Sequence, residues 1–383
     1  MAALAASTSL IPREVTSMQD IVESGPCFRR SAKCESIAYK LRYIWVPSAL
    51  RNPCMFHSSM YGASAHFDAL NEQKESQITI FHRMETLKFL KEELARSREA
   101  DDFMVASALT MAHMEGLGYD THARKIHSQG LQHMVSCRGG LKNLGFNGLL
   151  EDLIIIGIFH SAMSSDPKLG HNQNIDADIL GPQLGPRSAL SSIEFLLTIR
   201  EQDIRPSYQS INVVDLVLRR TYNMIMSWIS FSHTHNEVWG SKWHLARQRF
   251  LELFEGDNFF SGNDKMIEKC CKLAALITGA VIDYTHPFSE TSLEAFLQDL
   301  KSFIEQTDPK FWIQYAPEVF IWVCLTGAAV SRDKYCRRWF AIRFGPSIMV
   351  TSYAVPLMRK AWPYFCWLEE QCNKRMGESG VNK

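Results

Sequence analysis

Apolar residues recur at steps of three and four along most of this chain from Pro53 onward, the spacing that places side chains on one face of an α-helix. The clearest segment is 76–98, whose apolar stripe is formed by Ile80, Met84, Leu87, Leu90 and Leu94, with Phe81 beside it. Charged side chains largely cover its other sides: Arg83, Lys88, Lys91, Glu92 and Arg96. The pattern predicts a helix with one apolar stripe and a remaining surface in water.

The segments that follow predict helices that lie deeper in a core. Residues 101–117 are apolar almost all round, which is typical of a helix in the middle of a bundle. Asp120 or Thr121 can cap the next helix, and Gly139 with Gly140 can end it, because glycine readily takes the left-handed conformation of a helix terminus. The β-branched run at 154–156 also fits a strand, but the length of 148–163 and its helical neighbours favour a helix.

Proline and glycine interrupt the pattern at 166–188, which predicts a long loop or hinge. Helices are expected again at 188–202, 207–232 and 264–284, and 291–294 fits a capping box that opens another. Pro317 fits the first turn of a helix that runs to Ala329, and the last helices are expected at 333–343 and 346–372. The chain is therefore predicted to be all-α, a large irregular multi-helix bundle with long loops.

Three regions follow from this pattern. Residues 1–50 form a poorly patterned N-terminal segment, in which we expect loops and one short helix. Residues 51–376 form the all-helical domain, and 377–383 form a flexible tail.

Charge and cysteine usage bound the functional classes. Lysine plus arginine total 41 and aspartate plus glutamate total 41, so the formal net charge is zero. Nucleic-acid-binding domains usually carry a basic surplus, so we expect no direct DNA binding by the bulk of this chain. The 10 cysteines include no C-x-x-C pair and the first residues lack a signal-peptide pattern, which favours reduced thiols in the cytosol or nucleus. The most apolar run, 149–159, is too short to span a bilayer, so no membrane segment is expected.

Motifs for phosphate binding, serine hydrolysis and zinc proteolysis do not occur in the sequence. His113, His122, His127 and His133 cluster along the chain, but the spacings among the last three do not place them on one helical face. Helix-surface or core histidines are therefore favoured over a zinc site. Cys27 and Cys34 flank three basic residues, like one arm of a fungal binuclear zinc cluster, but two thiolates cannot hold two zinc ions. We expect no metal and no cofactor.

Two further groups have a structural and a functional interpretation. Asp283 and His286 could form an acid–base pair, but a histidine in the last turn of a helix is also favoured by the helix dipole. The methionines at 104, 111 and 114 and the tryptophans of the C-terminal third favour core packing over an apolar ligand pocket or partner groove. No catalytic residue is expected.

Several segments, taken in order, resemble the fungal-specific transcription factor domain, the regulatory domain of Zn2Cys6-type transcription factors. Residues 126–141 resemble its middle signature, which they match at His127, Gly130, Leu131, Met134, Val135, Arg138, Gly139, Gly140 and Leu141. Residues 52–70 resemble the opening helix, which in this family tends to end in an Ala-His-Leu-Asp-like step, here 65–68. Trp322, the pair 327–328 and the run 338–340 resemble the late segment. The run 156–159 departs from the family, and its N-terminal zinc cluster is missing.

The resemblance implies an all-α regulatory domain that acts in RNA polymerase II transcription in the nucleus, with the cytoplasm as an alternative location. It implies a homo- or heterodimer with related transcription factors or co-regulators, and a small-molecule effector. His127, Arg138, Gly139 and Gly140 are then structural residues, and no DNA-binding residue can be carried over. The missing zinc cluster fits either a truncated gene model or a free-standing regulator.

Two other interpretations remain. One is a helical ligand-binding or scaffolding protein without a transcription role. The other is an all-α enzyme of unrecognised class, although the sequence favours a protein that is not an enzyme.

Overall fold

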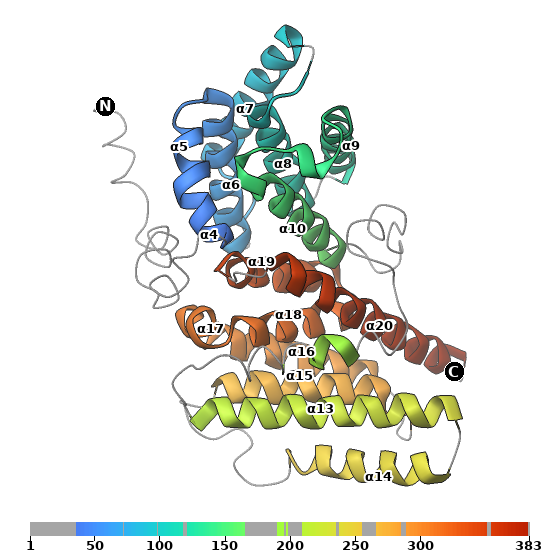
Figure 1. Ribbon diagram of the computed structural model, residues 1–383. Coiled ribbons are helices and arrows are strands. Elements are labelled where there is room, and N and C mark those ends of the chain that lie inside the picture. Colours follow the sequence, from blue (N-terminus) through green and yellow to red (C-terminus); the bar gives the residue numbers. More distant parts are fainter. Residues whose placement is uncertain are drawn as a thin grey trace. The chain divides into compact units, whose positions relative to one another are not determined.

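The computed structural model describes residues 36–71, 73–97, 99–117, 121–164, 190–194, 197, 209–234, 237–254, 266–284, 289–350 and 354–381. Within these ranges the regular elements are helices and no strand occurs, which confirms the predicted all-α fold (Figure 1). The chain divides into two compact units, Met1–Ser164 with Ile348–Val355 and Ser165–Ser347 with Pro356–Lys383. The predicted loop at 166–188 and most of the predicted helix at 188–202 lie outside the described residues.

The first unit is built from helices that precede residue 165. They are α4 (Ile37–Lys40), η1 (Leu41–Trp45), α5 (Val46–Ala49), α6 (Pro53–Leu70), α7 (Gln77–Arg96), α8 (Asp102–Leu117), α9 (Thr121–Cys137), η2 (Leu141–Asn143), η3 (Phe146–Gly148) and α10 (Leu149–Ser164). Consecutive helical turns thus run through α4, η1 and α5, where the sequence predicted loops and a single short helix.

Local sequence explains where the longer helices begin. The side-chain Oδ1 of Asn52 accepts a hydrogen bond of 2.9 Å from the backbone N–H of Met55, and Pro53 follows at the first helical position of α6, where it needs no hydrogen-bond partner. At α7, Ser76 Oγ accepts from the N–H of Thr79 at 3.3 Å. Each cap satisfies a backbone donor that the first helical turn leaves unpaired.

Helix α8 lies in the middle of the first unit, as its all-round apolar composition predicts. It packs against α6, α7, α9 and α10. Its buried side chains are Met104, Val105, Ala106, Ser107, Ala108, Leu109, Met111 and Glu115. Burial on every side leaves this helix without a solvated face.

The sequence favours a helix over a strand at 148–163, and α10 confirms this prediction. By length and composition, Phe146–Ser164 also meets the minimum for a membrane-spanning helix. Half of that window is buried, and α10 packs on α8, so its apolar character is accounted for by a core position. We attach no membrane role to it.

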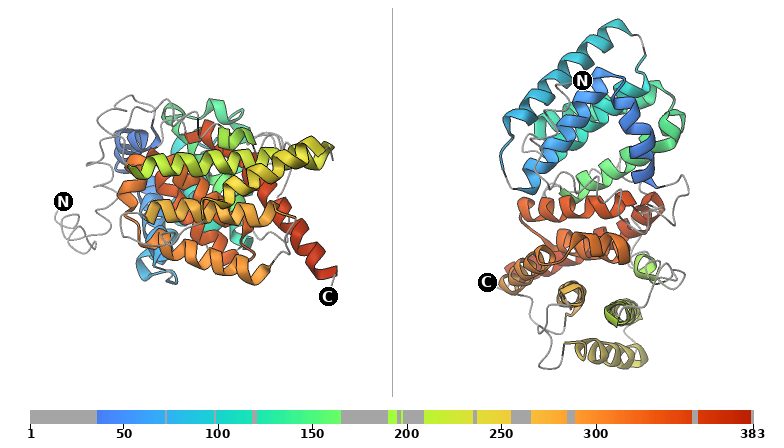
Figure 2. Two further views of the ribbon diagram at one scale, coloured as in Figure 1. Left: turned by 90° about the horizontal axis from the view of Figure 1, so that it is seen from below. Right: turned by 90° about the vertical axis from the view of Figure 1, so that its left-hand side faces the viewer.

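The second unit is formed by helices from Gln209 onward. They are α13 (Gln209–Thr234), α14 (Glu237–Leu251), α15 (Met266–Ile282), α16 (Glu290–Glu305), α17 (Pro309–Tyr315), α18 (Pro317–Val330), most of α19 (Lys334–Val350) and α20 (Ala354–Val381). Helix α13 packs against α14 and α15, and α15 packs against α16 and α18 (Figures 1 and 2). Every residue of α18 is buried, so this helix lies inside the unit.

A buried hydroxyl links three helices of the second unit. Tyr364 Oη on α20 lies 2.9 Å from Thr278 Oγ1 on α15 and 2.9 Å from Thr326 Oγ1 on α18. Burial raises the pKa of Tyr364, so the phenol stays protonated and retains its hydrogen for this network.

Three predictions for the second unit were wrong in detail. The box at 291–294 does not open α16, because Ser289 caps the helix with its Oγ accepting from Ser292 N at 3.2 Å. Pro346 does not separate two helices but lies inside α19, because the buried side chains of Phe344 and Ile348 on either side outweigh one lost backbone hydrogen bond. Helix α20 continues into the predicted tail, and the buried Arg375 anchors it near that end by donating from Nη2 to the carbonyl of Asp283.

Candidate functional site

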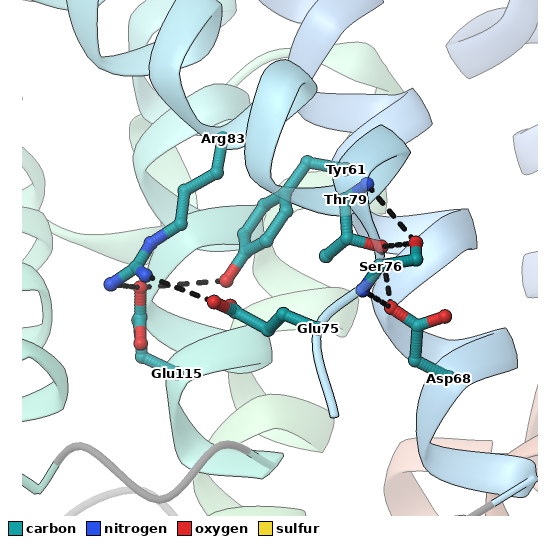
Figure 3. Close-up of polar contacts among 7 residues, drawn as sticks. All are labelled: Tyr61, Asp68, Glu75, Ser76, Thr79, Arg83 and Glu115. Atoms are coloured by element: carbon teal, nitrogen blue, oxygen red, sulfur yellow. Dashed lines mark hydrogen bonds and ion pairs between the residues drawn. The ribbon is translucent and has the colours of Figure 1, made fainter. Parts of the chain in front are cut away.

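A buried carboxylate fixes the start of α7 on α6. Asp68 Oδ2 accepts from the N–H of Ser76 at 2.8 Å and from Thr79 Oγ1 at 2.7 Å (Figure 3). Asp68 is 5% exposed, so these bonds replace the water that its carboxylate loses on folding. The N-terminus of α7 is therefore fixed in both position and rotation.

One turn further along α7, Arg83 reaches a second buried carboxylate on α8. Its Nη2 lies 2.7 Å from Glu115 Oε1, and its Nη1 lies 3.4 Å from Glu75 Oε2 (Figure 3). Tyr61 Oη donates to the same Glu115 oxygen at 3.4 Å. Burial, and then the negative charge of Glu115, raise the pKa of Tyr61, so the phenol remains the donor. This network joins α6, α7 and α8.

With this network α7 packs through a partly polar face and not through its apolar stripe. The inner face carries Thr79, Arg83, Thr86 and Leu90, of which the sequence had placed only Leu90 in the apolar stripe. The prediction that Arg83 belongs to the water-facing surface was wrong, because its partner Glu115 lies in the core 32 residues later in the chain.

The apolar stripe of α7 consequently points away from the first unit. Of the five stripe residues only Leu90 is buried. The exposed fractions of the outward side chains are 61% for Ile78, 42% for Ile80, 54% for Phe81, 64% for Met84, 40% for Leu87 and 46% for Leu94. Single exposed apolar residues are ordinary, but several on one helical face mark a contact surface. Ile80, Phe81, Met84, Leu87 and Leu94 lie on one side of the helix, whereas Ile78 is two and a half turns from Leu87 and lies on the opposite side. We call these five residues, without Ile78, the α7 outer face.

The motif at the end of α9 holds three segments of the first unit together. Gly139 and Gly140 have φ angles of 79° and 103°, and the N–H of Gly140 donates to the carbonyl of Val135 at 2.9 Å, which closes the helix. Arg138 donates from Nη1 to the carbonyl of Ala100 at 3.1 Å and from Nη2 to Asp102 Oδ1 at 3.0 Å. Arg138 therefore ties the end of α9 to the start of α8.

The same carboxylate also holds the loop that leads to α10. Asp102 Oδ1 accepts from the N–H of Gly145 at 3.2 Å, and a Cβ on Gly145 would lie only 1.9 Å from Asp102 Oδ2. Glycine is thus the one residue that fits there without a shift. His127, the remaining motif position, lies partly buried on α9.

The other candidate histidines do not gather into a metal site. His113 stacks on His160 with ring centroids 5.0 Å apart, and His133 Nε2 lies 3.6 Å from Cys137 Sγ. Among the described residues, no group of three histidine, cysteine, aspartate or glutamate side chains is placed to hold a metal ion. Burial, and then the nearby His66, lower the pKa of His113 to about 4, so it is neutral at pH 7.

The candidate cysteines and the acid–base pair have structural surroundings where they are described. Each cysteine in the described ranges is a free thiol, and burial raises the pKa of Cys54, Cys270, Cys324 and Cys336. Asp283 Oδ2 accepts from Arg247 Nε at 2.6 Å. Cys27, Cys34 and His286 lie outside the described residues.

The second unit contains a cavity of about 390 Å³ between α13, α14, α15, α16 and α20. Its wall is mostly apolar, and five polar residues line it: Arg247, Asp283, Ser289, Ser292 and Arg375. The methionines at 104 and 111 and the C-terminal tryptophans are buried core residues and are absent from the described lining.

Comparison with known proteins identifies no relative: no family model, no curated protein and no solved structure matches this chain.

Sequence reasoning missed the pairing of Arg83 with Glu115 and the cavity. One signal for the pair was present, because Glu115 is the one acid of α8 beyond its first residue, Asp102, in a largely apolar helix, and a buried acid needs a cationic partner. The cavity had no comparable signal, since its lining comes from five helices between 224 and 375.

Proposed function

We propose that this chain is the helical regulatory part of a transcription regulator that acts in the nucleus, and that the chain itself does not read DNA. The ordered family-like segments of the sequence support this role. The zero net charge and the lack of C-x-x-C pairs favour recruitment through another protein over direct DNA contact. Such a part must present a surface to other proteins.

The observation that carries the proposal is the α7 outer face. Its five side chains are about half exposed on average, and at ~200 Å² each they present about 500 Å² of apolar surface. We propose that the same face of a second copy covers it. Two such faces would bury about 1,000 Å² in total, which is at the threshold for a biological interface.

The spacing of α7 suits pairing with itself. Ile80, Met84, Leu87 and Leu94 follow steps of four, three and seven residues, as in helices that pack along a seam, and Lys91 occupies the seam position between Leu87 and Leu94. In an antiparallel pair with Leu87 on the two-fold axis, Ile80 lies opposite Leu94 of the second copy.

Sedimentation equilibrium of the full chain at micromolar concentration tests this surface. We expect a dimer for the unaltered protein and a monomer for Leu87→Glu, which places two carboxylates on the axis. Ile126→Glu is the matched control, because Ile126 is a single exposed apolar side chain among the described residues of α9, 52% exposed. This control should remain a dimer. An unaltered protein that is monomeric, or a Leu87→Glu variant that still dimerises, contradicts the self-pairing.

Fusion to an unrelated DNA-binding domain tests the transcription role separately. Recruited to a reporter promoter, the chain should change expression several-fold, in either direction, and Leu87→Glu should reduce the change. An unchanged reporter with nuclear protein at normal levels contradicts the transcription role and favours the scaffolding alternative. Tight, sequence-selective binding of DNA by the chain alone at low salt contradicts the absence of a reader.

A further inference from the structure

The cavity of the second unit has an apolar interior. Its volume of about 390 Å³ lies within the range of small-molecule sites, which is roughly 300–1,000 Å³. The partly buried side chains of Leu276, Ala280 and Phe296 line it, and the almost fully buried Met224 and Phe250 support them. Gly279 allows this wall to form, because a Cβ at that position would lie 2.8 Å from Phe250 Cε1. The interior therefore suits a hydrocarbon group.

Two arginines and one aspartate are the charged residues of the described lining. Arg247 Nε donates to the Asp283 carboxylate at Oδ2 over 2.6 Å, and Arg375 Nη2 donates to the backbone carbonyl of Asp283 over 3.0 Å. Each guanidinium group is thus held in place at the cavity wall by Asp283. Arg375 is 6% exposed and is held further by stacking 4.5 Å over the ring of Tyr284.

The N-terminus of α16 brings positive potential to the cavity. Ser289 and Ser292 lie in its first turn, line the cavity and are exposed to solvent. Backbone N–H groups at a helix start carry partial positive charge and favour anions. The ion pair of Arg247 with Asp283 also connects α14 to the end of α15. A structural role therefore explains this ion pair, but it does not explain the cavity beside it.

We propose that this cavity binds an amphipathic organic anion, with an apolar chain against Leu276, Ala280 and Phe296 and a carboxylate beside Arg247 and the first turn of α16. The proposal does not rest on a transcription role, since binding is measured on the purified chain. An uncharged analogue lacks the group that the two arginines and the helix terminus attract, and a cationic analogue is repelled by them.

Isothermal titration of the full chain with three probes of equal chain length tests the ligand class. Decanoate should bind at least tenfold more tightly than 1-decanol, and decyltrimethylammonium should not bind. Equal binding of decanoate and decanol overturns the anion preference, and preferential binding of the cation overturns it as well. No binding of any probe overturns the site.

Ser292→Glu tests the location without disturbing the fold, because an acid in the first turn of a helix is favoured by the helix dipole. It should weaken decanoate binding about tenfold and leave decanol binding unchanged. Thr291→Glu is the matched control, since it adds the same charge in the same turn but does not line the cavity. Equal effects of the two variants, or no effect of Ser292→Glu, would overturn the placement.

Discussion

Removal of the Arg83 charge should destabilise the first unit. Arg83→Met keeps much of the length of the side chain but leaves the carboxylate of Glu115, which is 3% exposed, without its cation. Tyr61 Oη at 3.4 Å then remains as its donor in the network of Figure 3. A buried charge that loses its partner is costly because water cannot replace the lost interaction.

The magnitude follows from the burial of the two partners. Breaking a buried ion pair costs roughly 3–5 kcal/mol. The Arg83 side chain is 26% exposed, so some water can reach the site and the lower end applies. We expect Arg83→Met to lower the free energy of unfolding by about 3 kcal/mol.

Urea unfolding followed by far-ultraviolet circular dichroism measures the effect, and hydrogen exchange of α7 peptides locates it. Lys88→Met on the same helix is the matched control, since the Lys88 side chain is 58% exposed. The control should change stability by less than about 0.5 kcal/mol. The double variant Arg83→Met with Glu115→Met should be more stable than Arg83→Met alone, because no buried charge is left unpaired.

Two results would refute this reasoning. If Arg83→Met were as harmless as Lys88→Met, the ion pair would not support the packing of α7. If the double variant were destabilised by the sum of both single changes, the two side chains would act independently and the stranded charge would not be the cause.

Three further changes test other parts of the structure. Gly140→Ala should lower the free energy of unfolding by about 1–2 kcal/mol, because a φ of 103° strains any L-residue although no atom obstructs a Cβ there. The control Gly130→Ala, inside α9, should raise it by up to about 1 kcal/mol. Urea unfolding measures both, and equal effects of the two variants would contradict the strain at Gly140. The folded-state pKa of His113, about 4, is below its unfolded value, so stability is fully present above about pH 6.5 and is lost as the pH falls toward 4. The free energy of unfolding should fall between pH 7 and pH 4.5 by up to about 2 kcal/mol more than in His113→Gln, and urea unfolding at the two pH values measures it. An equal fall in both proteins would contradict this role of His113. Tyr364→Phe should lower the free energy of unfolding by about 1–3 kcal/mol, because two buried threonine hydroxyls lose a shared hydrogen-bond partner. Calorimetric unfolding measures this, with Tyr335→Phe at an exposed tyrosine as the control. A smaller loss of stability in Tyr364→Phe than in the control would contradict that role.

The sequence alone determines most of the secondary structure. The spacing and continuity of apolar residues predict helices close to α7, α8, α10 and α18, because side chains three and four residues apart fall on one side of a helix. Gly139 and Gly140 end α9 where the sequence places them, since only a few residues on either side take part in that turn. Local signals suffice wherever the determining contacts lie within one helical turn.

Tertiary structure alone decides which face each helix buries and where a cavity remains. Helix α7 turns its apolar stripe outward because Glu115, on another helix, requires Arg83 and Tyr61 inside. Pro346 continues a helix because buried neighbours outweigh its missing hydrogen bond. A helical pattern shows that an apolar face exists, but the partner charges of distant segments determine whether that face meets the core or another molecule.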